Sequence, residues 1–305
     1  MQLPKQDRHA ELLLVIVTII AASGWIFSKE AIQHLPAFGF IGIRFLLAAL
    51  CLLPFCYRDL CLIRPIVLLK AFSVGSVLGC ALLLWIYAVS ISETLGEGAF
   101  IMTLSQLFVP LFAWLLFTDK PTTAFWYSLP FAIIGLVLLS ALGEWNQSST
   151  QLWFLLAAIM LAIHFNLNSR YAQRVPVLLL TCIQLCSIGI IGLVISAYFE
   201  VWPDVIPSST WRWVGLSIIV ATSLRYAIQT KGQKGASAAN AAVIMILEPI
   251  WVFIISIIWF AETMSLYKII GCSLILLSIL INRGMGQFVP LYLQKYKSRF
   301  MTKIR

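Results

Sequence analysis

Ten apolar runs occupy almost all of the 305-residue chain, and each is roughly 17 to 23 residues long. A helix of that length, rising ~1.5 Å per residue, crosses the ~30 Å hydrocarbon core of a bilayer. Because 61% of the residues are hydrophobic and only 11% are charged, the composition excludes a water-soluble globular protein. The sequence predicts an all-α polytopic membrane protein with ten transmembrane helices. We expect the spans at about residues 12–28, 37–57, 71–91, 98–118, 123–142, 151–169, 176–198, 211–230, 238–260 and 266–282.

The first run also has features of a secretory signal peptide. It follows Lys5 and Arg8 and contains the small residues Ala21, Ala22 and Ser23, which resemble a cleavage site. We expect the run to be retained as a transmembrane helix, because nine further spans follow it. The number of spans is then even, so both termini lie on the same side of the membrane.

The distribution of basic residues predicts which side that is. If the N-terminus is cytoplasmic, 16 of the 21 basic residues fall on the cytoplasmic side, Lys29, Arg212 and Lys268 fall outside, and Arg44 and Arg225 lie within spans. This asymmetry satisfies the positive-inside rule. The formal net charge of +9 therefore indicates orientation rather than nucleic-acid binding. We expect both termini in the cytoplasm and the protein in a bacterial cytoplasmic (inner) membrane.

The segment 284–305 is predicted to be a basic cytoplasmic tail. From Arg283 onward the chain has six basic residues and no acidic one, with four aromatic residues between them. Such a segment is expected to lie on the anionic inner leaflet of the bilayer. A solvated tail without a specific function is the alternative.

The sequence contains no chemical machinery of an enzyme or an ATP-driven pump. It has no phosphate-binding loop, no nucleophile beside a base, no metal-ligand cluster and no dinucleotide fingerprint. The seven cysteines fall within spans or predicted cytoplasmic loops, so a disulfide framework is not expected. We expect a non-enzyme without cofactor or metal, whose partners are a small-molecule substrate and the lipid bilayer.

The chain has the pattern of a duplicated five-helix unit, with a boundary at the polar loop 143–150. At an offset of 140 residues, Gln33 matches Gln173, Pro36 matches Pro176, and Arg44 falls on Gln184. Later in each half the offset becomes 143, and Asp119 then matches Glu262. Because each unit has an odd number of spans, the second is inverted relative to the first, which suits alternating access. The predicted domains are a first repeat at 1–143, a second repeat at 151–283, and the tail.

Several motifs resemble one known family of transporters. The second half contains Gln229-Thr230 followed by Gln233-Lys234, then Glu248-Pro249; the first half contains Gly24-Trp25, Arg44-Phe45 and Asp119-Lys120. The chain from about residue 10 to about residue 285 resembles members of the drug/metabolite transporter superfamily, EamA type. Gln106 stands where the second half has Pro249, so Pro110 is the candidate for a kink in the fourth helix.

The resemblance implies a ten-helix secondary transporter with a central cavity. Such proteins export or exchange small organic solutes such as amino acids, sugars, nucleotide conjugates and drugs, so we expect an exporter or exchanger of a small organic metabolite, an amino acid or related solute or a drug, that works by alternating access. A non-transporting sensor or accessory subunit that binds a small ligand with the same fold is the alternative, and a channel is a weaker one. The substrate, the coupling ion, the direction of transport and the choice between monomer and homodimer stay open.

Ionisable side chains within spans are costly, so they are the first candidates for a site. Four occur: Arg44, His164, Arg225 and Glu248. Arg225 and Glu248 are predicted to form an ion pair. The pair is either disrupted by a substrate or a proton during transport, or it is a permanent clamp on the helix break at Pro249. Arg44 either recognises an anion or holds a helix end. His164 either supports proton coupling or is a neutral, hydrogen-bonded core residue.

Further candidates are polar or aromatic residues of the spans. Asn166 and Asn168 are two residues apart, so at most one of them is expected to line the cavity with His164. The aromatic side chains either stack against a substrate or anchor the protein in lipid. The remaining candidates for substrate binding or coupling are Trp25, Trp85, Tyr87, Gln106, Tyr226 and Gln229.

Overall fold

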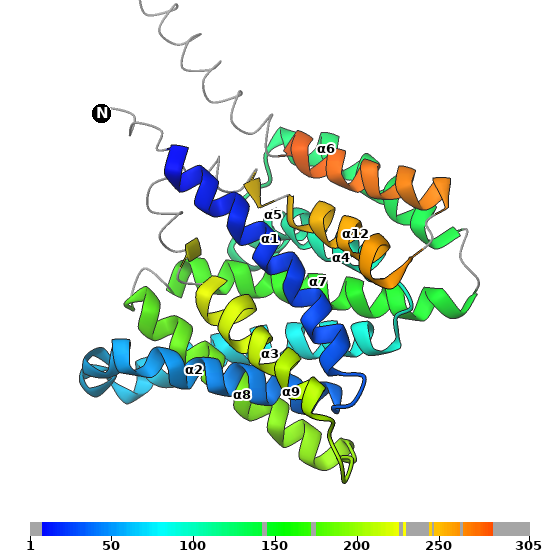
Figure 1. Ribbon diagram of the computed structural model, residues 1–305. Coiled ribbons are helices and arrows are strands. Elements are labelled where there is room, and N and C mark those ends of the chain that lie inside the picture. The colour runs from blue at the N-terminus through cyan, green and yellow to red at the C-terminus, as the bar shows by residue number, and fades with distance from the viewer. Residues whose placement is uncertain are drawn as a thin grey trace, which may run out of the picture.

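A computed structural model describes residues 8–141, 145–171, 175–225, 228–229, 244–245, 247–262 and 265–282 (Figure 1). Within these ranges the chain is helical and contains no strand, so the all-α prediction is confirmed. The helices are α1 (Arg8–Ala31), α2 (Ala37–Leu62), α3 (Pro65–Ile91), α4 (Leu95–Thr103), α5 (Ser105–Phe117), α6 (Thr123–Ala141), α7 (Trp145–Tyr171), α8 (Val177–Phe199), α9 (Ser208–Ile218), the π-helix η1 (Ile219–Leu224) and α12 (Leu247–Phe260). An apolar helix at Leu266–Asn282 follows α12.

Six helical segments are long and apolar enough to cross a membrane, and three shorter apolar helices accompany them. The six are His9–Ala31, Ala37–Leu62, Pro65–Ile91, Leu95–Phe117, Thr150–Tyr171 and Val177–Phe199, and the three are Thr123–Leu138, Leu247–Phe260 and Leu266–Asn282. The predicted eighth span corresponds to α9 and η1. Each predicted run thus contains described helix, while ten membrane crossings and their orientation stay predictions.

Two helix pairs form opposite sides of the bundle in Figure 1. One pair is α2 with α8, and the other is α6 with the helix Leu266–Asn282. The second pair is in close contact, because a Cβ on Gly135 of α6 would lie 2.7 Å from the carbonyl oxygen of Gly271. Between the two pairs lie α1, α3, α4, α7 and α12. Both pairs join one helix from each half of the chain, so neither half forms a separate body.

The α2–α8 contact is a seam of glycines in antiparallel helices. A Cβ on Gly42 would lie 2.7 Å from the backbone nitrogen of Leu193, and a Cβ on Gly189 would lie 2.7 Å from that of Leu46. A Cβ on Gly192 would approach the nitrogen of Gly42 to 2.9 Å. Contacts that advance along α2 therefore move backward along α8. Only glycine permits backbones this close, since any side chain would need the neighbouring helix to move.

Two helices depart from a regular course. The fourth predicted span is interrupted at Leu104, between α4 and α5, and Pro110 lies six residues later inside α5. Pro249 falls in the first turn of α12, where proline costs little because the N–H groups of a first turn have no partner within the helix. The π-helix η1 continues α9 directly and ends before Arg225.

Substitution of Gly189 by alanine is expected to lower the free energy of unfolding by about 1–3 kcal/mol, because the new methyl group would overlap the α2 backbone. Gly215→Ala is the matched control, since a Cβ there meets no atom within 4 Å. Alanine also favours a helix more than glycine does. Thermal unfolding in detergent would measure both variants, and equal effects would contradict the seam.

Candidate functional site

A central cavity of about 500 Å³ lies among helices from both halves of the chain. It includes most of the candidates predicted from the sequence. Those that line it are Trp25, Arg44, Trp85, Gln106, His164, Asn168, Arg225, Gln229, Glu248 and Pro249. Val177, the first residue of α8, also lines the cavity and is 58% exposed.

Three predicted residues are placed elsewhere or are not described. Tyr87 lies outside the cavity lining; its ring stacks on Phe38, with centroids 6.3 Å apart, and contacts Trp153 edge to face, with centroids 5.1 Å apart. Pro110 belongs to α5 and does not line the cavity. Tyr226 lies outside the described residues.

The buried guanidinium of Arg44 connects three helices. Its Nε donates to Oγ1 of Thr222 in η1 at 2.9 Å, and its Nη1 donates to Oγ of Ser28 in α1 at 3.0 Å. Each hydroxyl in turn donates to a backbone carbonyl, Thr222 to that of Ser217 and Ser28 to that of Gly24. The lone pairs of both hydroxyls are therefore oriented toward Arg44, and both of these acceptors are neutral.

The position related to Arg44 by the 140-residue offset has an equivalent hydrogen bond. Gln184 of α8 donates from Nε2 to Oδ1 of Asn168 at 2.7 Å. Asn168 is itself 140 residues after Ser28, so Arg44–Ser28 and Gln184–Asn168 are the same contact in the two halves. The two predicted repeats thus share a side-chain contact as well as matching residues in the sequence.

The side-chain oxygen of Gln184 determines which ring nitrogen of His164 carries the proton. Oε1 of Gln184 lies 3.3 Å from Nε2 of His164. Because the Gln184 Nε2 is assigned as the donor to Asn168, its oxygen accepts, and a neutral His164 carries its proton on Nε2. Nδ1 is then an acceptor. It is buried and has no hydrogen-bond partner among the described residues.

Asn166 has a structural role in the same helix. Its Nδ2 donates to the carbonyl oxygens of Val109 and Ala162, both at 3.0 Å, and it does not line the cavity. Asn168 and His164, one helical turn apart, both line it. The spacing argument for one cavity-lining asparagine agrees with this placement.

Arg225 and Glu248 form an ion pair at the wall of the cavity. Nη2 of Arg225 lies 3.3 Å from Oε2 of Glu248, and the two side chains are 26% and 22% exposed. Arg225 follows η1 directly, so the π-helix determines where its side chain enters the cavity. Nε of Arg225 has no partner among the described residues. The pair is therefore accessible from the cavity rather than sealed in the core.

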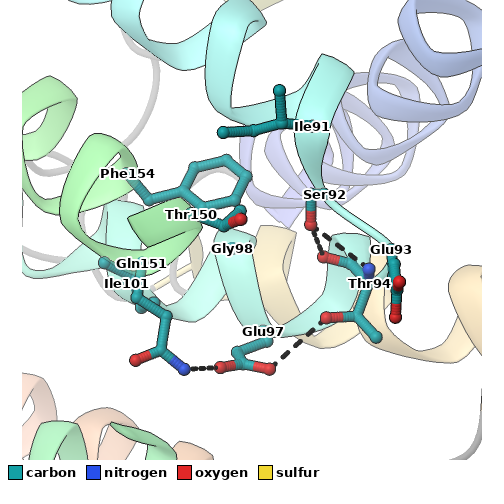
Figure 2. Close-up of a pocket in the computed structure, with 10 residues that line it drawn as sticks. All are labelled: Ile91, Ser92, Glu93, Thr94, Glu97, Gly98, Ile101, Thr150, Gln151 and Phe154. Atoms are coloured by element: carbon teal, nitrogen blue, oxygen red, sulfur yellow. Dashed lines mark hydrogen bonds between the residues drawn. The ribbon is translucent and has the colours of Figure 1, made fainter. Parts of the chain in front are cut away.

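An aromatic layer separates the central cavity from a second pocket. The layer consists of Trp25, Trp85 and Phe154. The ring centroid of Trp25 lies 5.1 Å from that of Trp85 and 6.1 Å from that of Phe154. Trp25 and Trp85 line the central cavity, whereas Phe154 lines the second pocket. This second pocket has a volume of about 260 Å³ and is shown in Figure 2.

A buried ion pair lies beside the second pocket, and sequence reasoning missed it. Nζ of Lys268 is 2.9 Å from Oε2 of Glu97, and the two side chains are 10% and 5% exposed. Glu97 also accepts hydrogen bonds from Gln151 and, at 3.3 Å, from Thr94 (Figure 2). Glu97 precedes the predicted span 98–118 by one residue, so the span prediction does not identify it as an intramembrane charge. The signal was available, because Glu97 and Lys268 begin two runs at the same predicted side of the membrane.

Further polar contacts tie helix ends together on this side of the aromatic layer. Glu262, after α12, accepts from the backbone nitrogen of Leu95 at 2.7 Å and from that of Gly96 at 3.4 Å. Lys29, near the end of α1, donates to the carbonyl oxygens of Val89, at 3.0 Å, and Ser92. A carboxylate at a helix N-terminus and an ammonium among carbonyl groups at a helix C-terminus both match the helix dipole. We call this end of the bundle the closed end.

Comparisons with known proteins give one consistent family. A model of the EamA-like transporter family matches the chain twice, at residues 8–141 and 148–284. Two proteins of Archaeoglobus fulgidus, each named "Uncharacterized transporter", are 24% and 25% identical; the alignments cover 90% of this chain and 96% and 85% of theirs. A crystal structure of a protein 17% identical in sequence aligns over 90% of this chain and 98% of that one, with a TM-score of 0.62, and shows likeness of fold alone.

Proposed function

The chain belongs to the EamA-like transporter family and is an integral membrane transporter, and on this premise we propose that it is a secondary active transporter. It exports or exchanges a small organic metabolite, such as an amino acid, a related solute or a drug, by alternating access. The proposal places the protein in a bacterial cytoplasmic membrane, with residues 1–143 and 151–283 as two inverted five-helix repeats and both termini in the cytoplasm.

The observation that carries the mechanism is the asymmetric cavity. Its lining extends from Val177, an exposed residue in the first turn of α8, to the aromatic layer, beyond which the Glu97–Lys268 pair joins helices at the closed end. Residues from both halves line it, including the related positions Arg44 and Gln184. Two inverted halves can exchange conformations, so the same site can face the other side in a second state of similar energy. Under the predicted topology the closed end is the extracellular one, so we assign this conformation to the inward-facing state.

Reconstituted flux tests the transporter proposal directly. Proteoliposomes loaded with an unlabelled mixture of amino acids and related organic acids are expected to accumulate labelled members of that mixture by exchange, and protein-free liposomes are not. Repeating the assay with and without a pH gradient separates exchange from proton coupling. Ligand binding without any flux would contradict the proposal and favour the sensor function.

The inverted arrangement predicts that the inter-repeat loop and the tail lie on opposite sides of the membrane. We expect a single cysteine at Ser148→Cys, in a background free of the seven native cysteines, to react with an impermeant maleimide from outside intact cells. A cysteine at Ser298→Cys is expected to react only after permeabilisation. Two matches to one family model and the paired Arg44–Ser28 and Gln184–Asn168 contacts support this prediction. Labelling of both positions from the same side would contradict it.

A further inference from the structure

We propose that Glu262 and Asp119 are reciprocal latches: Glu262 holds the closed end shut in the state described above, and Asp119 holds the opposite end shut in the second state. The inference rests on the proposed alternating-access function and names two residues that control the balance between its states. It depends on one backbone motif that occurs twice and on the different contacts that its two copies make.

The two carboxylates follow the same kind of helix end. Thr118 and Ala261 are the two non-glycine residues with positive φ among the described residues, at 64° and 51°, and they are 143 residues apart. In each copy the next backbone N–H donates to the carbonyl oxygen six residues earlier, at 3.2 Å for Asp119 and 3.4 Å for Glu262. A left-handed residue followed by such a bond is a Schellman helix end. Because the backbones are alike, a difference in their contacts reflects the conformation of the bundle.

The Glu262 copy is engaged. Its two carboxylate oxygens accept from the backbone nitrogens of Leu95 and Gly96, at 2.7 and 3.4 Å, in the first turn of α4. Amides of a first turn have no partner within their own helix, and a carboxylate there also matches the helix dipole. The contact therefore joins the end of α12, from the second half, to the start of α4, from the first half.

The Asp119 copy makes a different contact at the opposite end of the bundle. Its Oδ2 accepts from Nη2 of Arg170 at 2.6 Å, and the two side chains are 64% and 49% exposed. An ion pair this exposed contributes little free energy, because water solvates both partners after they separate. Asp119 can therefore leave Arg170 at small cost.

The repeat gives Asp119 an equivalent helix start to engage. The residue 143 positions after Leu95 is Ala238, where the predicted span 238–260 begins; Ala238 lies outside the described residues. When inverted repeats exchange conformations, a contact at one end is replaced by its equivalent at the other. Closure by Glu262 then alternates with closure by Asp119 at the start of that span.

The test measures how often the closed end opens in the purified full chain in detergent. Ile101 is fully buried and lines the second pocket, so a single Ile101→Cys, in a background free of native cysteines, reacts with a maleimide only after opening. When opening and closing are fast relative to the reaction, the rate of modification is proportional to the population of the open state. The ratio of rates between variants then gives the shift in the equilibrium, even where the open state is rare.

The two latches are expected to shift this rate in opposite directions. Glu262→Gln weakens the closure of the described state, so we expect a rate about fivefold higher. Asp119→Asn weakens the closure of the second state, so we expect a rate about fivefold lower. Since Asp119 is exposed, its variant is expected to fold, and that arm alone can decide. An unchanged rate in either variant, or a shift of both in the same direction, would overturn the proposal.

Two controls exclude simpler explanations. Glu200 makes the same kind of contact as Glu262, since it accepts from the backbone nitrogens of Phe38 and Gly39, each at 2.9 Å, but it lies within the α2–α8 pair. Glu200→Gln is therefore expected to leave the rate unchanged; a rise equal to that of Glu262→Gln would show general loosening and refute the latch.

Arg170→Met separates Asp119 from its exposed partner. We expect it to change the rate by no more than about twofold, and a decrease as large as that of Asp119→Asn would refute the role of Asp119. The assay requires neither substrate nor membrane. Opposite shifts without flux in proteoliposomes would refute transport while leaving the two latches supported.

Discussion

Replacement of Lys268 by methionine is expected to lower the free energy of unfolding by about 3–5 kcal/mol, because it leaves the Glu97 carboxylate buried without its cation. Gln151 and Thr94 would still donate to Glu97, but neither carries a charge. Denaturation of the purified protein in detergent would measure the change. We expect this to be the largest stability effect of a single substitution proposed for the chain.

Two controls separate the buried pair from a general effect of removing a lysine or arginine. Combining Lys268→Met with Glu97→Gln is expected to recover most of the lost stability, because the double variant no longer buries an unpaired charge. Arg170→Met removes one member of the exposed Arg170–Asp119 pair, whose side chains are 49% and 64% exposed, and is expected to have little effect. A double variant as unstable as Lys268→Met alone would contradict this account of the pair.

Neutralisation of Glu248 is expected to reduce transport far more than stability. Glu248→Gln removes the charge that balances Arg225 at the cavity wall, so the ion pair can no longer form and break between the two states and the exchange between them would slow. We expect a decrease in the rate of exchange of about tenfold or more, which corresponds to the usual size of coupling energies. The stability change should be small, since both side chains are partly exposed.

The control for Glu248 is a carboxylate outside the cavity. Glu30 accepts a hydrogen bond from Nε1 of Trp259 at 2.9 Å and does not line the cavity, so Glu30→Gln is expected to transport at close to the native rate. Proteoliposome exchange across a range of pH would compare the two variants. Full transport by Glu248→Gln with an unchanged pH dependence would contradict a switching role for the Arg225–Glu248 pair.

The sequence predicted the helices well because length and apolarity are local properties. It did not predict the interruption at Leu104 or the π-helix at Ile219–Leu224, since neither contains a proline or glycine to mark it. In η1, the Thr222 hydroxyl donates to the carbonyl five residues earlier and accepts from Arg44 of another helix. Such a departure depends on tertiary contacts, which hydrophobic periodicity does not contain.

The sequence identified the charged residues of the candidate site but not the residues to which they are hydrogen-bonded. Arg44, His164, Arg225 and Glu248 were recognisable because ionised or polar groups are costly within a span. The hydroxyl partners of Arg44 were not, because serine and threonine are common in transmembrane helices and do not distinguish a site. Tyr87 shows the limit of composition: two residues after Trp85, it points to another face of α3, where it packs on Trp153.

The glycine seam also has a consequence for how the molecule can move. At Gly42, Gly189 and Gly192 the backbones of α2 and α8 approach so closely that rotamer changes of side chains alone cannot accommodate a shift of one helix along the other. The two helices can pivot about this contact, but sliding or separating them would break it. Paired spin labels on α2 and α8 would therefore supply a fixed ruler against which displacement of the other helices during the transport cycle can be read.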